Sequence, residues 1–393
     1  MKSNWITATI DDVCTVVTDG AHNSPKSVEQ GHYMASVKDF TEFGFDFSNC
    51  KQIGEEDYEK LRNQGCVPEK NDILVGKDGA RYFEDIIIYK QDERPALLSS
   101  IAILRADCRM ITPEFLYYTL KSPAVRKDVR DNYGSGSAIP RIVLKDFKRM
   151  PFSFPSIEEQ RKITNLCSAI DAKIQINNAI NENLLQQAQA LYKDRFVDLK
   201  PFDGEMPPDW RLGTVSEIIE LHDSKRIPLS SRERANLAKI YPYYGATSVM
   251  DYVDRYLFDG IYLLLGEDGT VVDSKGFPIL QYVEGKFWVN NHAHIITGKN
   301  GFTVETLYLL FSLTNVQSIV TGAVQPKISQ GNLNKVSVVI PSEAELSAFN
   351  SIVQPIFAQI RNLRAENDRL AATRDTLLPR LMSGELDVSS LDI

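Results

Sequence analysis

The sequence has no long apolar run and no paired cysteine motif. No apolar stretch in its 393 residues approaches the roughly 18 residues needed to cross a bilayer. The N-terminal segment MKSNWITATIDDV lacks the apolar core of an export signal. The cysteines are odd in number and show no C-x-x-C spacing, which favours reduced thiols over a disulfide framework or a zinc site. They are Cys14, Cys50, Cys66, Cys108 and Cys167. We therefore expect a cytoplasmic protein that makes no membrane contact.

Basic residues are in deficit. Lys and Arg number 44 against 52 Asp and Glu, so the formal net charge is −8. Taken alone, this charge weighs against nucleic-acid binding, because phosphate contacts need Lys and Arg. A basic cleft can nevertheless coexist with solvated acidic helices, since net charge averages over all faces.

Signatures of catalysis are missing as well. The sequence has no G-x-x-x-x-G-K-[ST] loop for ATP. It also has no Asp/Asn-Pro-Pro-Tyr/Phe segment similar to amino-methyltransferase sites; MPPDW at 206–210 has only the two prolines. The glycines of GKDG and GEDG match no nucleotide motif well. We therefore assign no catalytic, cofactor-binding or metal-binding residue to this chain.

The main positive feature is an internal repeat. SGSAIPRIVLKDFKRMPFSFPS ends at Ser156, and TGAVQPKISQGNLNKVSVVIPS ends 186 residues later at Ser342. Each copy is followed by a long helical stretch at the same offset. A repeat of this length indicates duplicated domains rather than solenoid units, whose periods are shorter. The two halves therefore predict one task performed at two places.

Each half mixes strand and helix patterns in the same order. DILVGKDGARYFEDIIIY and GIYLLLGEDGTVVD predict strands around a glycine-containing turn. A helix is predicted after Thr112, a plausible N-cap, with Pro113 at its first position. The fold class is therefore α+β. We expect domain 1 at 1–154, the first long helix at 155–198, a Pro-containing linker at 199–209, domain 2 at 210–340, and the second helix with a C-terminal tail at 341–393.

The long helical stretches carry apolar residues at heptad spacing, and residues 157–198 contain no Pro or Gly. The two stripes match in length, which favours an intramolecular antiparallel coiled coil with one domain at each end. The alternative is that each helix packs only on its own domain. The predicted seam consists of Ile163, Ile170, Ile174, Asn181, Leu184, Leu191, Phe349, Ile356, Ile360, Asn367, Leu370 and Leu377.

Two local features of these helices give sharper expectations. Asn181 and Asn367 fall near the seam, and a buried Asn sets register at a cost in stability. We expect the two to approach each other. Pro355 lies inside the second helix and should kink it or displace its start, because proline lacks the backbone donor.

These motifs together resemble the specificity subunit of type I restriction–modification enzymes. The likeness is carried by PSIEEQRKITNLCSAIDAKIQINNAINENLLQQAQALYKDRF, by RDTLLPRLMSGELD near the C-terminus, and by YPYYGATS and FWVNNHAHII in the second half. One departure is the replacement of EEQ at 158–160 by AEL at 344–346.

The resemblance implies a DNA-binding subunit that is not itself an enzyme. It implies two target-recognition domains that read a bipartite site in double-stranded DNA and a coiled coil that sets the unread spacer. It also implies partners: two methyltransferase subunits, and restriction subunits that translocate DNA. S-adenosylmethionine, ATP and Mg would then belong to the partners and not to this chain.

The loops that join each domain to its helix are candidate DNA contacts, because they are locally basic in an acidic chain. The alternative is that they are solvated loops whose Ile142 and Ile328 dock in the core. Other candidates come from the divergent regions and from NNHAH. The candidates are Lys77, Arg81, Ser135, Ser137, Arg141, Lys145, Lys148, Lys225, Arg226, Tyr244, Asn291, His292 and Lys327.

His292 and His294 would share one face of an extended strand. No further His or Cys lies near them in the sequence, so a hydrogen-bonding role within the strand is favoured over metal binding. A DNA-facing role is the next alternative, because His and Asn can donate to base edges or phosphates.

Two other functions remain open on the sequence. One is a specificity subunit that works with a fused nuclease–methyltransferase of another restriction system. The other is a coiled-coil scaffold whose terminal domains bind protein or sugar rather than DNA.

Overall fold

The computed structural model describes residues 5–79, 81–133, 141–322, 324–386 and 388. It divides into two compact units. Unit 1 comprises Met1–Ile174 with Asp368–Ile393, and unit 2 comprises Gln175–Asn367. Each unit therefore holds one globular half of the sequence and a segment of both long helices. The domain borders expected from the sequence follow the chain in order and do not group the segments in this way.

Unit 1 contains a four-stranded sheet, a three-stranded sheet and a two-stranded pair, all largely antiparallel. The four-stranded sheet has the order β2 (Cys14–Asp19), β8 (Ile101–Ala106), β5 (Ile73–Gly76), β6 (Ile86–Ile88). The smaller sheet has the order β4 (Lys51–Ile53), β3 (His32–Ala35), β7 (Ala96–Leu97), and the pair is β1 (Ile6–Thr9) with β9 (Pro151–Phe154).

The helices of unit 1 cover these sheets. They are α1 (Ile10–Val13), α2 (Glu55–Asn63), α3 (Pro113–Lys121), α4 (Pro123–Asp128) and α5 (Leu144–Arg149). The helix predicted after Thr112 is confirmed, since the Thr112 side chain accepts a hydrogen bond from the Phe115 amide and Pro113 is the first helical residue. The helix ends at Lys121 because Ser122 takes an extended conformation before Pro123.

Unit 2 is built around one six-stranded sheet. Its order is β11 (Ile219–Leu221), β16 (Ala293–Gly298), β14 (Phe258–Gly266), β15 (Leu280–Val289), β12 (Tyr241–Tyr244), β13 (Val249–Val253), and a separate pair joins β10 (Arg211–Thr214) to β17 (Ser337–Ile340). Its short helices are α7 (Val215–Ile218), α8 (Ser231–Arg234), α9 (Val304–Ser312) and α10 (Gln330–Leu333). The mixed sheets and helices of both units agree with the predicted α+β class.

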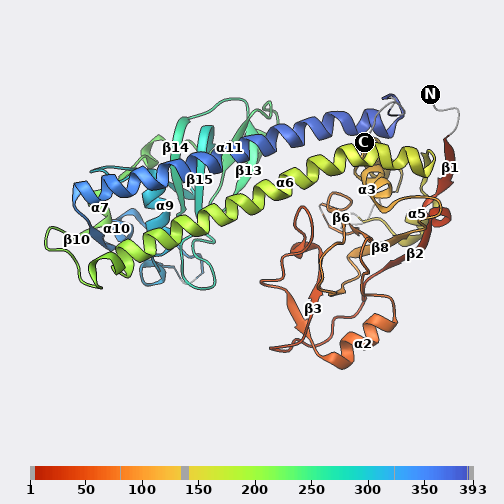
Figure 1. Ribbon diagram of the computed structural model, residues 1–393, viewed down its shortest axis with the longest axis horizontal. Coiled ribbons are helices and arrows are strands. Elements are labelled where there is room, and N and C mark those ends of the chain that lie inside the picture. The colour runs from red at the N-terminus through yellow and green to blue at the C-terminus, as the bar shows by residue number, and fades with distance from the viewer. Residues whose placement is uncertain (1–4, 80, 134–140, 323, 387, 389–393) are drawn as a thin grey trace. The chain divides into compact units, whose positions relative to one another are not determined.

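The two units repeat one scaffold and differ in what is added to it. In each, an N-terminal strand pairs with the strand before the long helix, and a short helix follows that first strand. The central strands β5 and β8 of unit 1 correspond to β14 and β16 of unit 2, followed by α3 and α9. Each unit also has a hairpin, β3–β4 or β12–β13, whose first strand pairs in parallel with the strand that precedes β8 or β16. Unit 1 holds this hairpin in a separate sheet beside helix α2, whereas unit 2 holds it in the main sheet (Figure 1).

The long helices are continuous. Helix α6 covers Ile157–Tyr192 and α11 covers Glu343–Met382, so both begin directly after the equivalent residues Ser156 and Ser342 (Figure 1). Of the two effects expected from Pro355, the displaced start is wrong, because α11 begins at Glu343 and continues through Pro355, which lies exposed on the helix surface. Among the described residues, no helix is both long and apolar enough to cross a membrane.

Both helices enter the core of each unit, in opposite sequence order. In unit 1, Ile163 and Cys167 of α6 share a core with Leu378 and Leu381 of α11. In unit 2 the shared core is larger, and it includes Ala188, Tyr192, Phe349, Val353 and Ile360. Segments that are early in α6 thus pack with segments that are late in α11, and the reverse, which means the two run antiparallel within each unit.

The predicted seam needs one correction and one change of partner. Leu191 is 42% exposed, and the neighbouring Tyr192, only 6% exposed, enters the core instead. Asn367 does not bond to Asn181. Its Oδ1 accepts from Asn177 Nδ2 at 2.8 Å, and its own Nδ2 donates to Asn178 Oδ1 at 2.8 Å. An asparagine pair does link the helices, one turn from the predicted position.

Replacing Pro355 with Ala should stabilise the protein. The change restores a backbone donor in the middle of a helix and replaces the least favourable helix residue with the most favourable, which we expect to raise the free energy of unfolding by about 1–2 kcal/mol. Chemical denaturation measures the change, and Gln359→Ala, at an exposed position about one turn further along the same helix, is the matched control. A loss of stability in P355A would mean that the pyrrolidine ring makes a contact the helix requires.

Candidate nucleic-acid interface

In both units, the loop that leads to the long helix docks on the tip of a hairpin. Asp78 forms an isolated bridge with Arg141 in unit 1, and Asp268 forms one with Lys327 in unit 2. Gly79 and Gly269 follow the two aspartates with φ of 94° and 84°, a conformation that favours glycine. The predicted turn and the predicted basic loop therefore meet at one place in each unit.

Buried isoleucines hold the loops to the hairpins. The Ile142 amide donates to the Lys77 carbonyl at 3.0 Å, and the Ile328 amide donates to the Glu267 carbonyl at 2.8 Å. Both isoleucine side chains are fully buried. Ile142 and Ile328 therefore dock in the core, which was one of the two alternatives for these loops. The polar residues Arg141 and Lys327 beside them lie at the surface.

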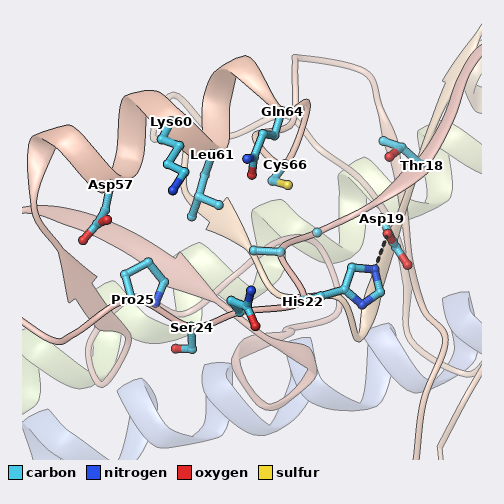
Figure 2. A pocket seen from close by; sticks show the side chains of 13 residues that line it. Thr18, Asp19, His22, Ser24, Pro25, Asp57, Lys60, Leu61, Gln64 and Cys66 are labelled. Carbon is cyan, nitrogen blue, oxygen red and sulfur yellow. Dashed lines mark ion pairs between the residues drawn. The ribbon is translucent and has the colours of Figure 1, made fainter.

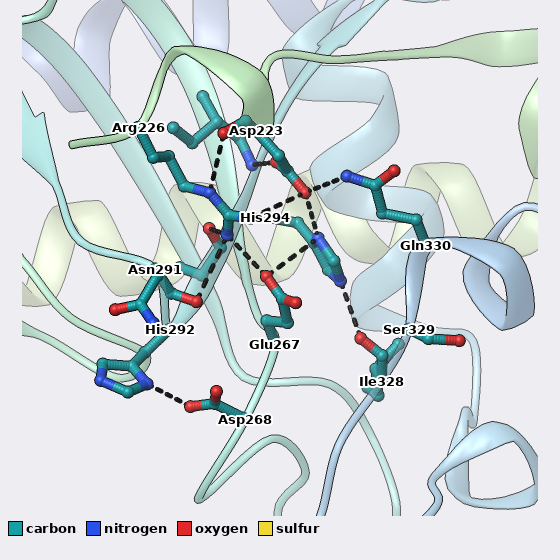
Figure 3. Close-up of polar contacts among 12 residues, drawn as sticks. Asp223, Arg226, Glu267, Asp268, Asn291, His292, His294, Ile328, Ser329 and Gln330 are labelled. Carbon is teal, nitrogen blue, oxygen red and sulfur yellow. Dashed lines mark hydrogen bonds and ion pairs between the residues drawn. The ribbon is translucent and has the colours of Figure 1, made fainter. Parts of the chain in front are cut away.

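A polar network lies beneath the hairpin tip of unit 2 (Figure 3). His294 is fully buried on β16, with Nδ1 2.6 Å from Asp223 Oδ2 and Nε2 2.8 Å from the Ile328 carbonyl oxygen. Gln330 Nε2 donates to Asp223 Oδ2 at 2.5 Å, and the backbone amide of Ile295 donates to Asp223 Oδ1 at 2.9 Å. Asp223 therefore joins β11, β16 and α10.

Cations and hydrogen-bond donors surround both carboxylates of this network. The His294 ring lies between two acceptors, the Asp223 carboxylate and the Ile328 carbonyl oxygen. Burial raises the pKa of Asp223, but hydrogen bonds from His294, Ile295 and Gln330 outweigh it and hold the pKa below its usual value. Glu267 behaves in the same way, because Arg226, His294 and Lys327 more than offset the effect of its burial on the pKa.

Asp223, Glu267 and His294 offer ligand atoms that lie within 4.8 Å of one another, a grouping that could suggest a metal ion. Their charges are already matched, however. Arg226 contacts Glu267 at 2.5 Å and Asp223 at 3.5 Å, and Lys327 contacts Glu267 at 3.2 Å. A divalent cation would have to displace these groups, so the cluster fits a structural ion-pair network better than a metal centre.

Unit 1 has a simpler version of this network. Asp19 ends β2 at the position that corresponds to Asp223, and it is only 9% exposed. Lys77, 7% exposed, contacts it at 3.3 Å, and His22 contacts it at 3.3 Å. Lys77 corresponds to Glu267 in the other unit. A buried carboxylate is thus common to both units, whereas its partners differ.

Two of the predicted DNA contacts, Lys77 and Arg226, point inward. Lys77 is turned inward to Asp19. The Arg226 side chain is only 14% exposed, and it also donates to the Ala293 carbonyl at 2.8 Å. These cations balance internal carboxylates, because an unpaired buried charge is costly. These contacts favour structural roles for Lys77 and Arg226 over direct phosphate contacts.

Most of the other candidates lie at the surface. Arg81 is 75% exposed and pairs with Asp85 at 2.7 Å, and Lys148 contacts Asp11 at 3.2 Å. His292 precedes β16 rather than lying in it, and Nδ1 contacts Asp268, so it does not share the environment of His294. Tyr244 is half-buried against Phe287. Also exposed are Arg141, Lys145, Lys225, Asn291 and Lys327. Ser135 and Ser137 lie outside the described residues.

Sequence reasoning missed a polar pocket in unit 1. The loop from Thr18 to Pro25 faces helix α2 across a cavity of about 510 Å³ (Figure 2). His22, Asn23, Lys60 and Gln64 line it with exposed polar groups. The turn-forming composition of TDGAHNSP was a possible signal, but only the fold brings α2 opposite that loop.

Comparison with known proteins gives the family. The sequence profile described as the type I restriction modification DNA specificity domain matches twice, at residues 2–186 and 207–371. The chain belongs to this family. The two matches begin and end within the two repeats, so the family resemblance predicted from the sequence is confirmed, and the duplication is a duplication of the specificity domain.

Individual relatives of this specificity-domain protein agree. It is 26% identical over 309 residues to the type I restriction enzyme MjaIX specificity subunit of Methanocaldococcus jannaschii, covering 72% of this chain and 71% of that one. It is 22% identical over 399 residues to the HindI specificity subunit of Haemophilus influenzae, covering 81% and 87%. A crystal structure of a type I restriction–modification S subunit from M. genitalium has the same fold, with a TM-score of 0.51, 18% identity and 96% coverage of both chains.

Replacing Asp223 with Asn should destabilise unit 2. The substitution removes the buried carboxylate that contacts His294, Arg226, Gln330 and the Ile295 amide and leaves Glu267 beside Arg226 and His294, and we expect a loss of about 2–4 kcal/mol at neutral pH. Denaturation of the variant and of Asp259→Asn, an exposed change on β14, checks this. Because the folded-state pKa of Asp223 is lowered, its contribution is full above the unfolded pKa of about 3.9 and is lost on further acidification. Equal stability of the two variants would contradict the network's role.

Proposed function

We propose that this protein is the DNA sequence-specificity subunit of a type I restriction–modification complex and that each unit reads one half of a bipartite site. The proposal rests on one observation: the same arrangement of loop, hairpin tip and buried carboxylate, here called the frame, occurs in both units, but the surface residues around it differ. Both units dock a basic loop on a hairpin tip over a buried carboxylate. The residues around that frame differ, which suits two related surfaces that read different half-sites.

The exposed groups around the frame have suitable chemistry. In unit 2, Lys327 forms a bridge with Asp268 and His292 contacts the same aspartate. Asn291 is exposed next to His292 in the sequence; Figure 3 labels Asp268, Asn291 and His292. Asn can bind adenine through two hydrogen bonds, and Lys can bind guanine or phosphate. Their counterparts in unit 1 are Arg141 and the exposed side of the pocket beside β2. Buried acids are neutralised by buried cations, so the acidic composition does not prevent anion binding at the tips.

The helices would act as a ruler. Helix α6 has 36 residues and α11 has 40, which at 1.5 Å per residue correspond to about 54 and 60 Å. We propose that they form an antiparallel coiled coil that fixes the number of unread base pairs. Two half-sites read from one side of the duplex would lie about one turn, or roughly 10 base pairs, apart.

The catalytic work would belong to partners. We propose that this chain docks two methyltransferase subunits that use S-adenosylmethionine, and that ATP-dependent restriction subunits join that core. The chain would then have no catalytic role of its own and would function in the cytoplasm with double-stranded DNA. A fused nuclease–methyltransferase as partner is the second possibility, and the genes that neighbour this one would distinguish the two.

Mapping of adenine methylation in cells tests the proposal. Cells that express this chain with its methyltransferase should carry methyladenine in a two-part motif with a fixed unread spacer. Asn291→Ala should alter the bases of one half-site only, since it lies in unit 2, whereas Lys299→Ala, exposed just beyond the far end of β16, should leave the motif unchanged. Methylation that is unaltered when this chain is deleted would refute DNA specificity. It would favour a scaffold whose domains bind protein or sugar.

The ruler predicts a change in spacer length. Seven residues inserted beside Asn178 in α6 and seven beside Asn367 in α11, which contact each other, keep the heptad phase and lengthen both helices by about 10 Å. The spacer should grow by about three base pairs, at 3.4 Å per base pair, and both half-sites should stay the same. The same methylation mapping measures it, and an unchanged spacer in a folded, active variant would exclude the ruler.

A further inference from the structure

Unit 1 contains a buried polar triad where its two long helices meet the globular half. Arg374 of α11 is 7% exposed and Asp171 of α6 is 5% exposed. Arg374 Nη1 donates to Asp171 Oδ1 at 2.6 Å, and the hydroxyl of Tyr118 on α3 donates to Asp171 Oδ2 at 2.6 Å. Both oxygens of the carboxylate are therefore occupied by donors from different elements.

The ionisation states suit this arrangement. Burial lowers the pKa of Arg374, but Asp171 and Asp375 more than offset it, so the pKa lies above its usual value and the guanidinium stays charged. Burial and the Asp171 charge raise the pKa of Tyr118, so the phenol keeps the proton that it donates. Glu42 lies 3.6 Å from the same guanidinium nitrogen, and Arg374 Nε donates to Asp375 at 3.0 Å.

Unit 2 has only apolar residues at the equivalent positions. The helices align at an offset of 186, which places Phe357 at the position of Asp171 and Ala188 at that of Arg374. Helices α3 and α9 align at their N-caps Thr112 and Thr303, which places Leu309 at the position of Tyr118. Ala188, Leu309 and Phe357 are each no more than 2% exposed and belong to one core cluster.

This difference affects which helices can pair. Because α6 and α11 are repeats of one sequence, an antiparallel pair of two α6 helices or of two α11 helices from separate chains has the same geometry. In an α6–α6 pair, Asp171 would face Ala188 of the other copy. In an α11–α11 pair, Arg374 would face Phe357. Either arrangement removes the opposite charge on the facing helix. Asp171 would keep only the Tyr118 hydroxyl, and Arg374 would keep the exposed Asp375 and the longer contact to Glu42. Loss of a partner for a buried charge is strongly unfavourable.

We propose that the Tyr118–Asp171–Arg374 triad is a pairing-specificity device, which directs α6 to α11 and prevents a second copy of this chain from pairing like helices. A buried polar residue that fixes helix partners at some cost in stability is known in coiled coils. The apolar set in unit 2 supplies packing, and the polar set in unit 1 supplies discrimination. The inference concerns assembly of the chain and does not depend on DNA binding.

The test transplants the apolar set of unit 2 into unit 1 of the full-length chain. The triple variant Tyr118→Leu, Asp171→Phe, Arg374→Ala removes the discrimination. We expect at least about a tenfold rise in the association constant for dimers relative to the unmodified chain. Native mass spectrometry of a mixture of two differently tagged chains measures it. A triple variant that dimerises no more than the unmodified chain overturns the proposal.

A charge reversal is the matched control. The double variant Asp171→Arg, Arg374→Asp keeps a cross-helix ion pair and should stay as monomeric as the unmodified chain. It should also recover most of the melting temperature lost in Asp171→Arg and in Arg374→Asp alone. A domain-swapped dimer keeps α6 against α11 and would form equally in all variants. If the double variant dimerises like the triple variant, the ion pair does not direct pairing. The same conclusion follows if the double variant restores the melting temperature of neither single variant. The melting temperatures can be compared even if the triple variant does not fold.

Discussion

Each compact unit needs a helix that the other half of the sequence supplies. The core of unit 1 is completed by Leu378 and Leu381, which lie more than 200 residues after its sheets. The core of unit 2 is completed by Ala188 and Tyr192, which follow the first globular half. Apolar surface on these helix segments can leave water only if both long helices reach both units. Because of this exchange, each core is complete only when segments of both long helices are present.

The same exchange explains why the loops before the helices are so firmly held. A helix that must enter a distant core needs a fixed starting direction. Ile142 and Ile328 provide it by bonding to the hairpin tips through their amides and burying their side chains. The carboxylates Asp19 and Asp223 lie beneath those tips and tie the first strand of each sheet to them. The loops and hairpin tips that set the direction of the long helices therefore also position the surface that we propose to contact DNA.

Duplication followed by divergence has acted differently at the three levels of this structure. The strand pairs, hairpin tips and helix starts are nearly the same in both units. The buried charges have changed sign or position, since Lys77 in unit 1 corresponds to Glu267 in unit 2, where Arg226 supplies the cation. The outer parts differ most, since unit 1 holds the hairpin β3–β4 in a separate sheet beside α2, whereas unit 2 holds the hairpin β12–β13 in its main sheet. Because the shared frame accepts different buried ion pairs, the surface residues of the two units can differ while each apolar core stays intact.

The sequence by itself determined the repeat, the α+β class, the helix start after Ser156, and the turn at Gly79 and Gly269, because these depend on local pattern and backbone preference. The start of the second helix at Glu343 needed the structure, since Pro355 pointed to a later start or a kink. It also determined the family. Only the tertiary structure decided which charges point inward: Lys77 and Arg226 look like surface cations until Asp19 and Glu267 are seen beside them. The seam shows the same limit. A strict seven-residue repeat selects Leu191, but an α-helix drifts by about 20° per heptad, so after four heptads from Ile163 the buried position has moved to Tyr192. Asn177 replaces Asn181 opposite Asn367 because the axial offset of two helices is set by the cores they enter, and no pattern within one helix records it.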